Sequence, residues 1–144
     1  MRPQVFAKTF FREAFKLTNI TIDGDMSPIA NIPKNRPVLF IANHPFGVID
    51  GLIMCNLALD YADDFQVVIN SLLCQDRDLV PHFLPIDFSE TKEAAKRNVR
   101  TKQLAGKALD NGVPLILFPS GMVSTAGAPG FGNVVDAPWT TFIA

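Results

Sequence analysis

The hydrophobic positions of this chain change their spacing along its length, from a helical period to short continuous runs. In residues 4–17 (QVFAKTFFREAFKL) apolar side chains recur every three or four positions, and Lys8, Arg12 and Lys16 form a separate stripe. This period predicts an amphipathic helix within residues 1–20. Aromatic side chains beside a cationic stripe suit a helix lying in a membrane interface, and they equally suit a helix packed on its own domain.

Short apolar runs further along the chain predict strands at 38–42, 65–69, 84–86 and 114–118, the third being the weakest. Helical patterns separate them, at 50–62 and at 87–110, where Asp87 and Glu90 give a cap-like start and Asn111 and Gly112 an end. The alternation of helix and strand predicts an α/β fold with a mostly parallel central sheet flanked by helices. We expect a single domain over residues 21–144.

Glycines and prolines predict loops at 23–37 and after residue 118. The final stretch, 137–144 (APWTTFIA), reads as the beginning of another element. We therefore expect the chain to be incomplete at its C-terminus.

Composition narrows the possible partners. The chain has 144 residues, 48% of them hydrophobic and 19% charged, and a net charge of −1, which gives no general attraction to nucleic acid. The first 20 residues carry four cations and one glutamate, a net +3, so the remainder carries −4. No apolar run approaches the 18 residues or so of a membrane span, and Cys55 and Cys74 lack metal or redox spacing. We expect reduced cysteines, a cytoplasmic location and no nucleic-acid partner.

Candidate chemistry lies in residues 43–51 (NHPFGVIDG), which hold one of only two histidines. A neutral imidazole can accept a proton near neutral pH, and a carboxylate on its other nitrogen holds it in one tautomer. A histidine beside a strand is more often structural, but Pro45 and Gly47 form a turn that a core histidine does not need. His44 is therefore a candidate general base, and Asp50 is the residue that would orient it.

A second polar turn, residues 118–124 (FPSGMVS), follows the last predicted strand. Because parallel strands end at one edge of a sheet, both turns are expected to face one crevice. Backbone N–H groups of the Gly47 and Gly121 turns are candidate oxyanion donors. Ser120 also raises the alternative of a serine hydrolase, although the glycines of a nucleophile elbow are missing around it. The candidate substrate-binding residues in the two turns are Phe46, Gly47, Phe118, Pro119, Ser120 and Gly121.

These motifs resemble those of the glycerolipid acyltransferase superfamily, the lysophosphatidate acyltransferase-like enzymes. Residues 43–51 are similar to its first motif, Asn-His-x4-Asp, with five residues instead of four between His44 and Asp50. That spacing, with Pro-x-Gly after the histidine, resembles the hemolysin-like or ornithine-lipid-type branch. Residues 118–124 are similar to the third motif, Phe-Pro-Glu-Gly-Thr-Arg-Ser, and residues 84–88 (LPIDF) stand where the second motif, ending in Ile-Asp-Arg, is expected. The resemblance covers roughly residues 36–125.

The resemblance implies transfer of a fatty acyl group to a lyso-lipid hydroxyl, at the inner face of the membrane. Acyl-CoA or acyl-carrier protein would be the co-substrate, with no bound cofactor and no metal. The motif arginines and glutamate that grip phosphate are replaced here by Phe88, Ser120 and Val123. Losing the bidentate arginines favours a lyso-aminolipid or another hydroxyl acceptor over a phosphate-bearing one.

Two further features leave alternatives open. Lys92, Lys96 and Arg100 recur at four-residue steps near Arg97 and Lys107. They form either a solvated helix face or a docking surface for an acidic carrier, CoA phosphates or anionic lipid, with Arg97 and Arg100 as its binding residues. His82 lacks ligand spacing and is expected to be structural. A non-catalytic lipid-binding module that uses the N-terminal helix alone is the remaining alternative.

Overall fold

The computed structural model describes residues 3–34, 36–126 and 132–139. Its helices are α1 (Pro3–Leu17), α2 (Ser27–Ala30), α3 (Val48–Tyr61) and α4 (Lys92–Asp110), with 3-10 turns η1 (Ser71–Leu73) and η2 (Val80–His82). Its strands are β1 (Leu39–Ile41), β2 (Gln66–Asn70), β3 (Phe83–Ile86), β4 (Leu115–Leu117), β5 (Thr125–Ala126) and β6 (Val134–Val135).

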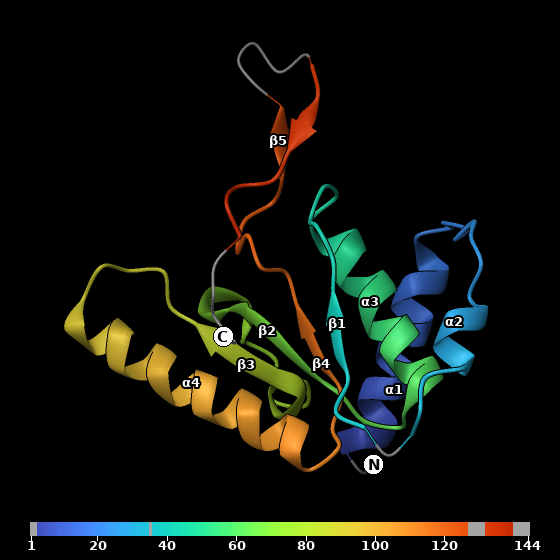
Figure 1. Ribbon diagram of the computed structural model, residues 1–144, viewed down its shortest axis with the longest axis horizontal. Coiled ribbons are helices and arrows are strands. Elements are labelled where there is room, and N and C mark those ends of the chain that lie inside the picture. Colours follow the sequence, from blue (N-terminus) through green and yellow to red (C-terminus); the bar gives the residue numbers. More distant parts are fainter. Residues whose placement is uncertain (1–2, 35, 127–131, 140–144) are drawn as a thin grey trace.

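The central sheet has four strands in the order β1-β4-β2-β3, and every neighbouring pair is parallel (Figure 1). The predicted α/β fold with a parallel sheet is confirmed. The last strand of this sheet in the sequence, β4, lies between the first two, with Leu39 opposite Leu115 and Ile41 opposite Leu117. This insertion places the end of β1 beside the end of β4.

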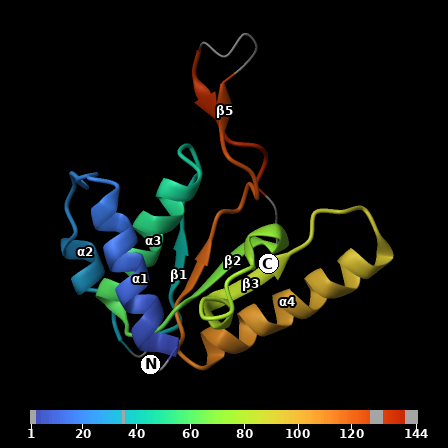
Figure 2. The ribbon, with the colours of Figure 1, turned by 180° about the vertical axis from the view of Figure 1, so that it is seen from behind.

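Successive side chains of a strand point to opposite faces of the sheet, so these apolar strands present apolar side chains on both faces. Helices cover both faces. Val67 and Ile116 pack in one core with α1 and α3, whereas Val68 and Leu115 pack in a second core with α4. Figure 2 shows α1, α2 and α3 on one side of the sheet and α4 on the other. Parallel strands covered on both faces read as continuous apolar runs, as the sequence has them.

Helix α1 packs on the domain. Ala7 and Phe11 are buried in the core under α3, and the Phe11 ring meets Phe65 edge-on at 5.4 Å between centroids. Phe10 is 39% exposed and Leu17 is 86% exposed. The helix thus docks through Ala7 and Phe11, with Phe6 packed partly against the same core, and leaves Phe10 at the surface.

The cationic stripe of α1 is paired within the chain. Lys8 Nζ lies 2.8 Å from Asp63 Oδ1, and Arg12 Nη2 lies 2.5 Å from Asp60 Oδ1. Lys16 pairs with Glu13 on the same helix at 2.6 Å. The cations that an interfacial helix would present to lipid headgroups are therefore paired with carboxylates of this chain.

Two predicted helix starts and one predicted loop were wrong. Helix α3 begins at Val48, two residues earlier than expected, and residues 27–30 form α2 inside the predicted loop. Helix α4 begins at Lys92 rather than at Asp87, because Thr91 has extended backbone angles and its hydroxyl accepts the Ala94 N–H at 3.0 Å. Asp87 is not its cap.

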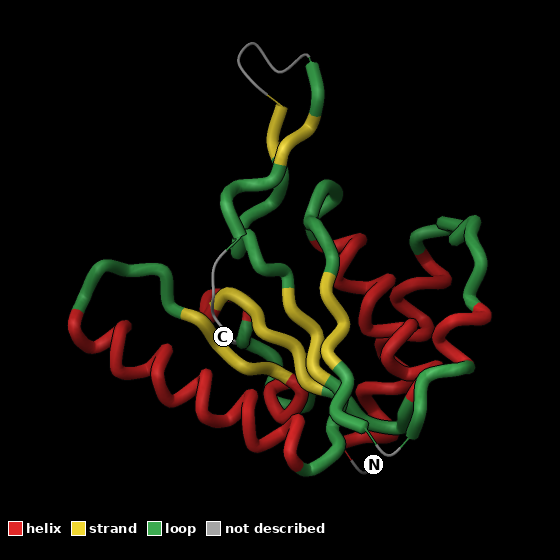
Figure 3. Tube along the Cα trace, viewed as in Figure 1, coloured by secondary structure: helices red, strands yellow, loops and turns green. Residues whose placement is uncertain are grey.

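The region after residue 118 also differs from the expected plain loop. Thr125 pairs with Val135 and Ala126 with Val134, forming a short antiparallel hairpin that projects beyond the sheet (Figure 3). Residues 140–144, the last part of the predicted further element, lie outside the described residues. None of the helices within the described ranges is long and apolar enough to cross a bilayer.

Candidate active site

The candidate base stands at the carboxyl end of β1. The chain leaves that strand, turns through Asn43 to Gly47 and enters α3. Gly47 precedes the helix with φ 62° and ψ −121°, a conformation that strongly favours glycine. The turn brings Asp50, in the first turn of α3, back toward His44.

His44 and Asp50 form a hydrogen-bonded pair. Nδ1 of His44 lies 3.0 Å from Oδ2 of Asp50, and the two side chains are 19% and 11% exposed. The same carboxylate oxygen accepts the Phe46 N–H at 2.7 Å. A carboxylate can only accept, so Nδ1 carries the proton and Nε2 is the nitrogen able to take one from a substrate.

The second turn forms the other wall of the site. Phe118, just after β4, stacks on the His44 ring with centroids 4.2 Å apart and planes 21° apart. The Ser124 N–H donates to the His44 carbonyl at 2.8 Å. The expected convergence of the two turns is observed, and it results from the insertion of β4 next to β1.

The turn after β4 uses its polar groups internally. Pro119 and Ser120 are buried, and the Ser120 hydroxyl donates to the Met122 carbonyl at 2.8 Å. A hydroxyl has one proton, so in this arrangement Ser120 cannot also donate to the imidazole. The Gly121 N–H donates to the Phe118 carbonyl at 2.9 Å and is thus committed to the turn rather than aimed at an oxyanion.

Exposed apolar side chains gather at the carboxyl edge of the sheet, in the segments that follow all four strands. Their exposed fractions run from 45% to 74%. Two contacts connect different loops: Val123 lies against Gly47, and the Phe88 ring lies against Gly121. We call this set the apolar rim: Phe46, Val48, Leu72, Leu73, Phe88, Met122 and Val123.

The predicted docking arginines lie away from the dyad. Asp87 follows β3, which is the opposite edge of the sheet from β1, and Arg97 of α4 pairs with it. Three strand spacings separate these edges, roughly 14 Å. Hydrogen bonds from Ser89, then the Arg97 guanidinium, lower the pKa of Asp87 to about 2. Arg100, one turn further along α4, is exposed.

His82 has the structural role expected of it. Its side chain is buried, Nδ1 lies 3.1 Å from the Phe65 carbonyl, and its ring packs on Phe65 at 5.3 Å. In the parts of the chain that the structure describes, no group of three histidine, cysteine or acidic side chains could hold a metal ion.

Sequence reasoning missed Asp136. Its carboxylate accepts the Ser124 hydroxyl through Oδ1 and the Trp139 indole N–H, at 3.0 Å, through Oδ2. These two hydrogen bonds, followed by the His44 backbone N–H and the His44 charge, lower the pKa of Asp136. A single aspartate beyond a glycine-rich loop gives no signal in the sequence, because only folding brings it to residue 44.

A histidine–aspartate pair lies at the carboxyl edge of a parallel sheet, and comparison with known proteins gives the class of enzyme to which the chain belongs. The chain belongs to the family described as acyltransferase, whose model matches residues 4–143. No solved structure matches the chain.

Two curated relatives give the likeness more detail. Both are named lyso-glycine lipid O-acyltransferase, one from Phocaeicola vulgatus and one from Bacteroides thetaiotaomicron. They are 29% and 30% identical to this chain over 121 residues, which is 83% of it. The chain spans 40% and 42% of their lengths, so it corresponds to less than half of each relative.

Proposed function

We propose that this chain carries the catalytic dyad of a lipid O-acyltransferase, which moves a fatty acyl group from acyl-CoA or acyl-carrier protein to a lyso-lipid hydroxyl. One observation carries the proposal: Asp50, itself nearly buried, holds Nδ1 of His44 at 3.0 Å beside the Phe118 turn. Family membership and the two lipid O-acyltransferase relatives support it.

In the proposed reaction His44 Nε2 takes the proton of the acceptor hydroxyl as that oxygen attacks the thioester carbonyl. The new C–O bond gives a tetrahedral oxyanion, which collapses with cleavage of the C–S bond. The imidazolium then returns its proton to the leaving thiolate. Asp50 stabilises the imidazolium and keeps the ring in place, and a positioned base of this kind contributes roughly 10²- to 10⁴-fold in rate.

The acceptor class follows from what surrounds the dyad. Phe88 and Val123 stand where the resemblance expects arginines, and both belong to the apolar rim. A lyso-aminolipid fits this surface better than a phosphate-bearing acceptor, since an arginine grip on phosphate is lacking at these positions. The names of the relatives, which specify a lyso-glycine lipid, support the same class.

The proposed location is the cytoplasmic membrane surface, with the apolar rim toward the lipid. Rim side chains of 45% to 74% exposure lie in the segments that follow the strands, and Phe46, Val48 and Val123 lie in the two turns of the site, so they offer apolar contacts to an acyl chain. The N-terminal helix is proposed to supply little of this contact, because Phe11 is buried and Lys8 and Arg12 are paired internally.

The acyl donor's acidic groups are proposed to meet α4. Lys92, Lys96, Arg97 and Arg100 are all exposed, and Arg97 pairs with Asp87. Replacing Arg100 with glutamine is expected to raise KM for the donor at low salt and to change it little at high salt, because screening weakens long-range attraction. An unchanged KM at every ionic strength would remove α4 from donor binding.

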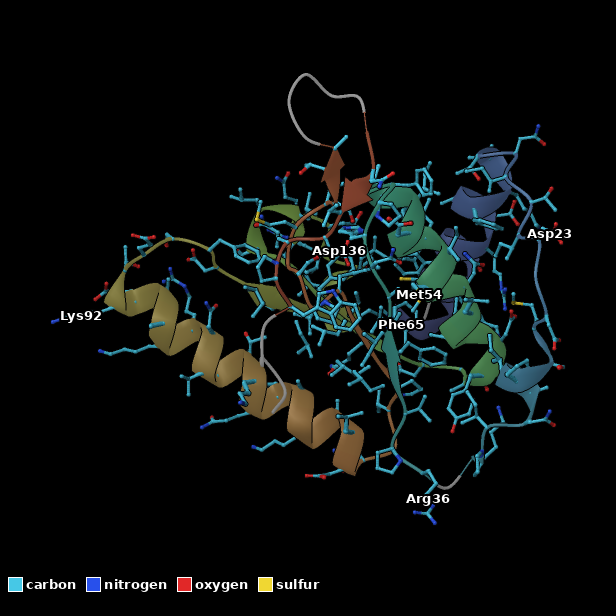
Figure 4. All side chains as sticks on the ribbon, turned by 45° about the horizontal axis from the view of Figure 1, so that its top comes forward. Asp23, Arg36, Met54, Phe65, Lys92 and Asp136 are labelled. Carbon is cyan, nitrogen blue, oxygen red and sulfur yellow. The ribbon has the colours of Figure 1, made fainter. Side chains whose placement is uncertain are left out.

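The function is tested by thiol release from long-chain acyl-CoA and acyl-carrier protein, with and without a panel of lyso-aminolipids and lysophospholipids. We expect acceptor-dependent release that falls at least 10²-fold in His44→Ala and Asp50→Asn. Asp23→Asn is the matched charge control, since Asp23 is exposed and far from the site (Figure 4). Thermal unfolding shows whether each variant is folded.

Two other outcomes identify the alternatives. Acceptor-independent release that is lost in Ser120→Ala means a serine hydrolase, against which the Ser120–Met122 hydrogen bond argues. Vesicle binding without release from any donor, lost on substitution of Phe10 and unaffected by His44→Ala, means a non-catalytic lipid-binding module.

A further inference from the structure

Asp136 connects the segment that returns from the β5–β6 hairpin to the catalytic turn. The carboxylate lies near the base of the hairpin (Figure 4). It accepts the Ser124 hydroxyl from the outgoing side of the hairpin and the Trp139 indole N–H from the returning side. The Asp136 side chain thus joins Ser124, which precedes β5, to Trp139, which follows β6.

Ser124 links Asp136 to the backbone of His44. The Ser124 N–H donates to the His44 carbonyl at 2.8 Å, and the Ser124 hydroxyl donates to the Asp136 carboxylate. Ser124 thus connects the Asp136 carboxylate to the His44 carbonyl. Ser124 is 8% exposed, so water competes weakly for these bonds.

We propose that Asp136 is a positioning residue for His44, which fixes the backbone from which the catalytic imidazole projects; this rests on the proposed function of His44 as the base. Asp50 accepts from the ring at Nδ1 and from the Phe46 N–H, and Ser124 holds the His44 carbonyl. Without Asp136, Ser124 would lose the carboxylate that fixes its side chain.

The role requires a carboxylate. Asp136 receives two donors, one on each oxygen, and an ionised carboxylate accepts on both, whereas an asparagine presents one oxygen and one N–H₂ group. In an Asp136→Asn variant the amide nitrogen would face a donor, and one bond of the set would be lost. The negative charge of the side chain would be lost with it.

A displacement of the ring by a fraction of an ångström is enough to affect the rate, since a misplacement near 1 Å costs about 10²-fold. We expect Asp136→Asn to lower kcat roughly 10- to 100-fold with KM for donor and acceptor nearly unchanged. Trp139→Phe and Ser124→Ala each remove one donor and keep the carboxylate charge, so we expect smaller losses of kcat. Asp23→Asn is the matched control and should leave kcat unchanged.

A second measurement, ¹⁵N NMR of the imidazole rings, reads positioning without turnover. The chain has two histidines, and buried His82 serves as an internal reference. The Asp50 bond predicts a pure Nδ1–H tautomer for His44. In Asp136→Asn we expect its two nitrogen signals to move toward each other as the tautomers mix, with the His82 signals unmoved.

The outcomes separate this inference from the proposed function. If His44→Ala keeps wild-type transfer, the proposed function fails, and Asp136 is then judged by the ring signals alone. If His44→Ala abolishes transfer while Asp136→Asn keeps both wild-type kcat and wild-type ring signals, the positioning role is overturned. Should Asp136→Asn not fold, Trp139→Phe and Ser124→Ala decide: wild-type kcat and ring signals in both would overturn it.

Discussion

Adjacent phenylalanines on α1 provide a direct test of how this helix is used. Phe11 is 6% exposed and packs edge-on against Phe65, whereas Phe10 is 39% exposed. Substituting each with alanine removes the same atoms from neighbouring positions of one helix. The two variants therefore share helix propensity and differ in the burial of the ring they lose.

The magnitude follows from the buried area. With roughly 200 Å² for a phenylalanine side chain and about 25 cal/mol per Å², a 33-point difference in exposure (39% minus 6%) is worth about 1.7 kcal/mol. Phe11→Ala also leaves a cavity between α1 and the sheet, whereas the space left at position 10 opens to solvent. We expect Phe11→Ala to cost about 4 kcal/mol of unfolding free energy and Phe10→Ala about 2 kcal/mol.

Urea and thermal unfolding of both variants beside the wild type measure this difference. For a chain of this size the two melting temperatures should differ by about 4–8 °C, with Phe11→Ala the lower. Equal losses in the two variants would refute the docked arrangement of α1. Two small losses together with a joint loss of vesicle binding would instead establish an interfacial helix.

Three further predictions concern the site and its surroundings. Gly47→Ala places a side chain at φ 62°, so it should cost about 1–2 kcal/mol of unfolding free energy and lower the rate of transfer by moving the dyad. Gly51→Ala, in α3 with open space around its Cβ, should leave stability unchanged or raise it. Chemical unfolding and transfer assays of both variants test this, and equal effects would contradict it. Hydrogen bonds from Ser89 lower the pKa of Asp87 from 3.8 to about 2, so the ionised carboxylate stabilises the fold above about pH 4 and this contribution is lost as pH falls toward 2. Acid titrations should show a shallower loss of stability in Asp87→Asn than in the wild type over that window. Identical curves would exclude the contribution. Ser120→Ala should keep the rate of transfer within a few-fold of wild type and lower the unfolding free energy by about 1 kcal/mol, because it removes one hydrogen bond of the turn. Complete loss of turnover in a folded variant would restore the hydrolase alternative.

Local patterns located most elements of the fold. The continuous apolar runs predicted all four strands of the central sheet within about two residues, because each strand is covered on both faces. The helical periods of α1 and α4 were recognisable because each of these helices buries one face, whereas most residues of α3 are buried or half-buried all around the helix. Their exact starts were less predictable: a cap depends on backbone angles, so Thr91 rather than Asp87 begins α4.

The candidate dyad was also predictable, because its two members are near neighbours in the sequence. A six-residue separation with a glycine in the intervening turn lets His44 and Asp50 meet without help from distant segments. Ser120 was harder to interpret. Its residue type permits a nucleophile, and only the direction of its hydroxyl, toward the Met122 carbonyl, assigns it to the turn.

By itself, then, the sequence determined the strands, the helices and the histidine–aspartate pair, since each depends on residues close together along the chain. The tertiary structure decided everything that depends on strand order. Inserting β4 beside β1 brought Phe118 onto the His44 ring, and the segment returning from the hairpin brought Asp136 to the His44 backbone. It also turned Phe11 inward and left Phe10 outside. Hydrophobic period selects the face of an element that is buried, but long-range packing alone selects which segments meet there.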